Sequence, residues 1–135
     1  MGTQETSVIV IDSNILIDYL RGHAPAKRFI MDLPDQGVLF SAVVETELLA
    51  GQENKDVVVR AMLLQMLSKW SKVPVDNTIA MMAGDIVREY GVQTPDALVA
   101  ATALESESIL YTNNIKHFHH IKNLKVRKPY SQSNT

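Results

Sequence analysis

The feature that most constrains the fold is the run SVIVI at residues 7–11, in which only Val and Ile follow Ser7 and Asp12 comes directly after Ile11. A strand with no polar face has to be covered on both sides, which is typical of the central strand of a parallel sheet. The sequence therefore predicts an α/β protein whose central strand ends at an acidic residue.

Short apolar stretches and helical stretches alternate along the rest of the chain. We expect strands at residues 38–40, 73–75, 109–111 and 124–127, and helices at residues 14–20, 25–33, 41–50, 55–71, 77–90 and 94–105. Asp76 is the expected N-cap of the helix at 77–90, and Gly91 closes it. This alternation indicates a parallel sheet in an α/β sandwich. The length fits one domain, placed at residues 1–129, with a frayed polar tail at residues 130–135.

Composition excludes several classes of protein. The absence of cysteine excludes disulfide scaffolds, thiolate metal sites and cysteine nucleophiles, and makes the cytoplasm the default location. The N-terminal apolar run ends at Asp12, too early for a signal peptide or a membrane span. Fifteen acidic against thirteen basic residues give a net charge of -2, so nucleic-acid binding would depend on a local patch.

Three acidic residues fall where ligands bind in such sheets, beyond the carboxyl ends of the strands. Asp12 follows the central strand, Glu47 lies in the helix after the second strand, and Asp96 lies in the first turn of the helix that leads into the fourth strand. A helix that feeds a parallel strand runs opposite to it, so its first turn lies at the same edge. We expect the three carboxylates to converge.

Each of these acids has a simpler interpretation. Asp12 is also a candidate helix N-cap, Asp96 a complement to a helix dipole, and Glu47 a solvated charge. Glu45 lies about 200° around the helix from Glu47, so both cannot face one site, and the apolar neighbours favour Glu47. We interpret three further acids as surface or capping residues: Asp18, Asp76 and Asp85.

Convergence of the carboxylates would require a compensating charge. Two carboxylates about 4 Å apart repel by roughly 4 kcal/mol at an effective dielectric constant of about 20. A divalent cation compensates best, and oxygen-only ligands select Mg²⁺ or Mn²⁺ over zinc. The predicted metal ligands are Asp12, Asp96 and Glu47. The chemistry this predicts is metal-assisted hydrolysis of a phosphodiester bond.

Four segments together resemble a known family: VIVIDSNILIDYL, SAVVETELLAG, TPDALVAATAL and ILYTNNIKHF. In this order and spacing they resemble the PIN-domain ribonucleases, most of all the VapC-type toxins of toxin–antitoxin pairs, from Val8 to Arg127. The resemblance implies a PIN-like three-layer α/β/α sandwich with a five-stranded parallel sheet in the order 3-2-1-4-5. It further implies Mg²⁺- or Mn²⁺-dependent RNA cleavage, a homodimer, and an antitoxin protein bound across the active-site groove.

The resemblance also implies roles for single residues. Asp12, Glu47 and Asp96 correspond by position to the acidic residues of the family, and Thr112 to its hydroxyl residue. In place of a fourth acid after this threonine the chain has Asn113-Asn114.

The departure from the family pattern changes two expectations. The Asn114 amide is expected to orient water or phosphate in the catalytic site, and the lost carboxylate favours one tightly held ion over two. A later position that is acidic in some relatives is His117.

The segment from Lys116 to Lys128 contains several basic residues and no acid. It is either a patch that contacts RNA phosphates or an ordinary solvated edge, and the sequence does not separate these readings.

We predict a metal-dependent endoribonuclease and keep two alternatives. One is a PIN fold that binds RNA or protein without catalysis. The other is a phospho-acceptor domain of the response-regulator receiver type, since Asp12 and Asp76 each follow a strand. A receiver, however, needs a second acid after the first strand, where this chain has Ser13.

Overall fold

The computed structural model describes residues 7–131. Its centre is a five-stranded sheet in the order β3-β2-β1-β4-β5, with all neighbouring strands parallel. This confirms the predicted strand order. The strands are β1 (Ile9–Ile11), β2 (Val38–Ser41), β3 (Ser71–Val73), β4 (Ile109–Tyr111) and β5 (Lys125–Arg127).

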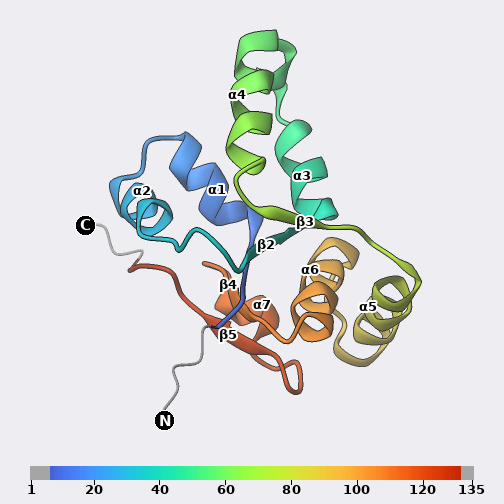
Figure 1. Cartoon of the computed structure of the whole chain (residues 1–135). Helices are drawn as coiled ribbons and strands as arrows, with labels where there is room; N and C mark the ends of the chain where they lie inside the picture. The colour runs from blue at the N-terminus through green and yellow to red at the C-terminus, as the bar shows by residue number, and fades with distance from the viewer. Residues whose placement is uncertain (1–6, 132–135) are drawn as a thin grey trace.

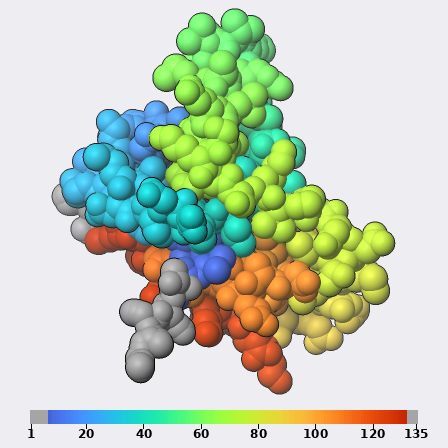
Figure 2. Space-filling model, viewed as in Figure 1, coloured from blue at the N-terminus to red at the C-terminus, as the bar shows by residue number. Residues whose placement is uncertain are grey.

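Helices cover both faces of the sheet, with α1 and α2 on one side and α5 and α6 on the other (Figure 1). A hairpin made of α3, η1 and α4 projects from the body as an arm, which also stands clear in the space-filling view (Figure 2). The helices are α1 (Ser13–Leu20), α2 (Ala24–Met31), α3 (Ala42–Leu49), the short 3₁₀ helix η1 (Gln52–Lys55), α4 (Val57–Leu67), α5 (Asn77–Tyr90), α6 (Thr94–Glu105) and α7 (Ile115–Phe118).

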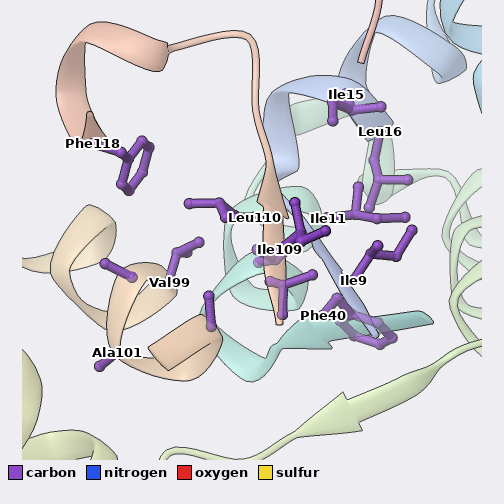
Figure 3. Close-up of a cluster of buried hydrophobic side chains, with 14 of the residues drawn as sticks. Ile9, Ile11, Ile15, Leu16, Phe40, Val99, Ala101, Ile109, Leu110 and Phe118 are labelled. Atoms are coloured by element: carbon purple, nitrogen blue, oxygen red, sulfur yellow. The ribbon is translucent and has the colours of Figure 1, made fainter. Parts of the chain in front are cut away.

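The central strand is buried as the sequence predicts. Val10 and Ile11 have no exposed surface, and neither does Leu110 on the adjacent β4. Figure 3 shows the side chains of β1 and β4 packing with Phe40 of β2 and with α6 residues such as Val99. Burying such apolar side chains contributes roughly 1.5–3 kcal/mol each, so the pairing of β1 with β4 is held firmly.

The sheet order creates a switch point at β1, where the chain builds first toward β2 and β3 and later toward β4 and β5. Ligands of open α/β sheets bind at such a point, outside the carboxyl ends of the strands. The order also excludes the receiver alternative, because receivers have the order 2-1-3-4-5. Asp76 lies after the edge strand β3, where its carboxylate caps α5 by accepting from the Ile79 N–H (2.9 Å).

The region before and within β3 differs from the prediction. The helix expected at residues 55–71 is shorter, Val57–Leu67. Asp56 caps it through the N–H groups of Val58 and Val59, and residues 52–55 before it form η1. The strand expected at 73–75 is found at Ser71–Val73. Pro74 has no N–H for the ladder, so the strand ends before it.

Two features of the C-terminal region were not anticipated. The short helix α7 lies within the basic segment and buries Phe118 completely. The frayed tail predicted from residue 130 is wrong at Tyr130, whose hydroxyl donates to Asp18 Oδ2 (2.7 Å) and whose ring lies near Phe29 and His23. Residues 132–135 of that tail lie outside the described residues. Within residues 7–131 no helix has the length and apolar character needed to cross a membrane.

Candidate active site

Asp12 lies at the carboxyl end of β1 and is only 4% exposed. Its Oδ1 accepts a hydrogen bond from the Ser13 N–H (2.8 Å), which makes it the N-cap of α1. Its Oδ2 accepts from the hydroxyl of Thr112 (2.8 Å), the first residue after β4. Asp12 is thus both a helix cap and the carboxylate at the switch point of the sheet.

The electrostatic environment of Asp12 disfavours its charge. Burial raises the pKa of Asp12 to about 6, while the hydrogen bonds from Thr112 and Ser13 act in the opposite direction. The negative charges of Asp96 and Glu47 add to the increase in pKa. The three predicted carboxylates are therefore close enough to interact.

Glu47 approaches this site from α3. Its Oε1 accepts a hydrogen bond from the Ser13 hydroxyl (3.0 Å), so Ser13 connects Glu47 to the first turn of α1. Glu45 points elsewhere and pairs with Lys72 (3.1 Å) at the sheet edge. The structure thus separates the two glutamates as the helical spacing predicts.

Asp96 lies in the first turn of α6 and is partly buried. Its Oδ2 is 3.0 Å from Nδ1 of His117 in α7. His117 therefore contacts one of the three carboxylates.

A network of amides and hydroxyls surrounds Asp12. Asn14 Nδ2 donates to Asp12 Oδ2 (3.3 Å) and to Thr112 Oγ1 (3.1 Å), and Asn14 Oδ1 accepts from the Asn113 N–H (3.2 Å). The Asn114 N–H donates to Thr112 Oγ1 (3.0 Å), while the Asn114 side chain is exposed. These bonds fix the loop after β4 against α1.

Sequence reasoning missed Ser13, Asn14 and Asn113 as members of this network. The signal was present for the first two, since both follow Asp12 in the first turn of a helix that starts at the carboxyl edge of the sheet. The side chain of Asn113 gave no such signal. Its Nδ2 donates to Asp18 (3.3 Å) and to the Tyr130 hydroxyl (3.1 Å), and not to any of the three site carboxylates.

The donor set fits a hard divalent cation. All three carboxylates offer oxygen, which suits Mg²⁺ or Mn²⁺, and none of the ion pairs of the described residues involves Asp12. The fit is one of donor chemistry: within residues 7–131 no three acidic, histidine or cysteine side chains are grouped closely enough to hold an ion as they lie. An ion here would keep several waters, as Mg²⁺ usually does.

Comparison with known proteins identifies the class to which this fold and site belong. The family model described as "PIN domain" matches residues 9–124, so the chain belongs to the PIN-domain family. Its relatives within that family are VapC ribonucleases.

Two of these relatives come from Mycobacterium tuberculosis. Ribonuclease VapC10 is 32% identical over 124 residues, which cover 87% of this chain and 91% of the relative. Ribonuclease VapC19 is 32% identical over 116 residues, which cover 81% and 90%.

Solved structures give the same result. A toxin–antitoxin complex from Klebsiella pneumoniae contains a chain with a TM-score of 0.76 and 30% identity, covering 90% of this chain and 98% of that one. A DNA-bound VapBC from Salmonella typhimurium also has a TM-score of 0.76, covering 93% of this chain and 100% of that one. At 20% identity, the second similarity is informative about the fold alone.

Proposed function

We propose that this chain is a metal-dependent endoribonuclease that hydrolyses RNA phosphodiester bonds as the toxin of a toxin–antitoxin pair. The observation that carries the proposal is the buried carboxylate of Asp12 at the switch point, interacting with Asp96 and Glu47, in a chain whose relatives are VapC ribonucleases. The absence of cysteine supports a cytoplasmic location.

Asp12 and Asp96 would hold the ion, with Glu47 completing the ligand set or orienting water together with Ser13. A bound Mg²⁺ or Mn²⁺ supplies Lewis-acid stabilisation of the charge that develops on the phosphate. Thr112 and Asn14 hold the Asp12 carboxylate in one orientation, and His117 does the same for Asp96.

The number of ions follows from the charge of the site. Asparagines occupy positions 113 and 114 where a fourth carboxylate would favour a second cation. We propose one tightly held ion, with the exposed amide of Asn114 available to orient water or phosphate.

A protein antitoxin is the proposed partner, supported by the neighbour described as a toxin–antitoxin complex. A cavity of about 390 Å³ lies between α1, α3 and α4, with mostly apolar walls that include Leu20, Leu48 and Met62 and with Glu47 at its edge. An antitoxin segment seated there would contact Glu47. We also propose that the chain forms a homodimer, on the basis of the family resemblance. Size-exclusion chromatography with light scattering tests this oligomeric state.

The decisive experiment is RNA cleavage by the purified chain with Mg²⁺ or Mn²⁺, compared with EDTA. Asp12→Asn should abolish cutting, whereas Asp85→Asn should not, because Asp85 is an exposed α5 residue that pairs with Arg88. Cleavage that persists in Asp12→Asn would refute the catalytic assignment. RNA binding without any cleavage by the wild type would instead support the non-catalytic module.

A further inference from the structure

A second cavity lies beside the carboxylates, on the side of α7. It has a volume of about 340 Å³ and is lined by residues 113–117 and by Lys128, which follows β5. None of these lining residues is acidic, and two of them are lysines. The cavity shares His117 with the active site, since His117 contacts Asp96.

The wall formed by the loop after β4 is held in place by the active-site network. Asn113 donates its N–H to Asn14, and Asn114 donates its N–H to Thr112. His117 is fixed from the other direction by Asp96. The cavity wall and the Asp12 carboxylate therefore share the same hydrogen-bonded supports.

The opposite wall is fastened through Tyr130, two residues after Lys128. The Tyr130 hydroxyl donates to Asp18 (2.7 Å) and accepts from Asn113 Nδ2 (3.1 Å). Asn113 also donates to Asp18 (3.3 Å), so three side chains form a closed set of hydrogen bonds. This set ties the C-terminal segment that carries Lys128 to the loop that carries Asn114.

The cavity carries positive charge and the neighbouring active site carries negative charge, and no ion pair joins Lys116 or Lys128 to an active-site carboxylate among the described residues. Lys116 and Lys128 are exposed, and neither takes part in an ion pair among the described residues. The carboxylates of Asp12 and Glu47 likewise have no basic partner within residues 7–131. Lys116 and Lys128 therefore remain available for a ligand that carries negative charge.

We propose that this cavity is a subsite for an RNA phosphate next to the one that is cut. Lys116 and Lys128 supply the positive charge, and the Asn114 amide is a further donor. The inference rests on RNA cleavage at the neighbouring carboxylates, and it assigns the basic segment to a defined place on the RNA path. For these two lysines it favours contact with RNA phosphates over an ordinary solvated edge.

The test measures the salt dependence of binding of a fluorescein-labelled single-stranded oligoribonucleotide. The full chain carries Asp12→Asn to prevent cutting, with Mg²⁺ present. Each phosphate neutralised by a lysine contributes about 0.7 to the slope of log K against log salt for a single strand. We expect Lys116→Gln and Lys128→Gln each to reduce the slope by about that amount and to weaken binding about fivefold at low salt.

The matched control is Lys125→Gln. Lys125 is also exposed and is the first residue of β5. It pairs with Ile109, the first residue of β4, and so lies at the amino end of the strands, away from the cavity. It should leave the slope unchanged. Because all three lysines are exposed, none of the substitutions threatens the fold.

Two results would overturn the subsite. One is a slope that Lys116→Gln and Lys128→Gln leave unchanged, and the other is an equal decrease for Lys125→Gln, which would indicate diffuse surface charge. The wild type, assayed for cleavage in parallel, separates the two proposals. If it cuts RNA while the slopes are unchanged, only the subsite is wrong; if it neither cuts nor binds RNA, the proposed function fails as well.

Discussion

Thr112 donates its hydroxyl proton to Asp12 over 2.8 Å, although the two residues are 100 positions apart in sequence. Each follows the end of a strand, and the pairing of β1 with β4 places those ends side by side. Both side chains are buried, so neither is oriented by solvent. Thr112 accordingly helps to set the orientation of the central carboxylate, together with the Ser13 N–H and Asn14.

Removing the Thr112 hydroxyl should weaken metal binding or RNA cleavage. Thr112→Val keeps the shape but leaves Asp12 without this donor, and loss of such a support costs about 10–100-fold in metal affinity or activity. Thr112→Ser retains the hydroxyl and is the control. Cleavage rates and Mn²⁺ titrations by calorimetry check this, and equal activity of the valine and serine variants would contradict it.

The metal-free protein should lose stability as the pH rises. The pKa of Asp12 is about 6 in the folded chain and 3.8 ordinarily, so the folded state holds this proton more tightly. The contribution of Asp12 is fully present below about pH 4 and is lost as the pH passes 6, a change of about 3 kcal/mol. Urea unfolding in EDTA at pH 4.5 and 7 should show about 2 kcal/mol of this change, because at pH 4.5 Asp12 is already partly ionised in the unfolded chain.

Asp12→Asn serves as the control for this pH dependence. At pH 7 in EDTA we expect the variant to be about 1 kcal/mol more stable than the wild type, because it removes a buried charge while disturbing the bond from Asn14. The gain should disappear at pH 4.5. A wild-type stability that does not change between these pH values would refute the argument.

A divalent ion should stabilise the wild type. An ion that binds only the folded state adds about 2.7 kcal/mol at a concentration of 100 times its Kd. We expect Mn²⁺ to raise the Tm of the wild type and to leave that of Asp12→Asn nearly unchanged. An equal rise in both proteins would place the bound ion elsewhere.

The two glutamates of α3 offer a matched comparison. Glu47→Gln should reduce cleavage strongly, since Glu47 accepts a hydrogen bond from Ser13 and its charge raises the pKa of Asp12. Glu45→Gln should preserve cleavage, because it removes only the exposed pair with Lys72, worth at most about 1 kcal/mol. Cleavage assays paired with thermal unfolding distinguish the roles, and the opposite pattern would assign the site to Glu45.

Tyr130→Phe should destabilise the fold while leaving α1 and β4 intact. The hydroxyl hydrogen bond to the Asp18 carboxylate is worth about 1.5–3 kcal/mol, and the remaining ring still packs against Phe29. Tyr90→Phe is the comparison, since the Tyr90 hydroxyl only accepts from the exposed backbone of Lys122 (3.2 Å). Equal losses of stability for Tyr130→Phe and Tyr90→Phe in urea unfolding would show that the Tyr130 hydroxyl is not especially important for the fold.

The sequence predicted the parts of the structure that depend on local chemistry. The all-apolar run before Asp12 predicted a buried central strand, and Asp76 and Gly91 marked the ends of α5, where Gly91 adopts a left-handed φ of 71°. The spacing of Glu45 and Glu47 predicted which one faces the site.

Contacts between distant segments could not be read in the same way. Nothing near Tyr130 in sequence indicates Asp18 or Asn113, which become its neighbours only when the sheet is assembled. Asp18 was for that reason interpreted as a surface or capping residue. The exposure of Met62 and Met81, which is 64% and 73%, likewise depends on how the helices pack and not on the apolar character of the side chains.

The position of β1 in the sheet has a consequence for the timing of activity. Asp12 is synthesised early, but its neighbours Asp96 and Thr112 come from the last third of the chain, and β4 has to insert beside β1 to bring them together. A growing polypeptide that ends before β4 therefore lacks the carboxylate site that we propose for RNA cleavage. The proposed site can form only after translation has passed β4 and Thr112.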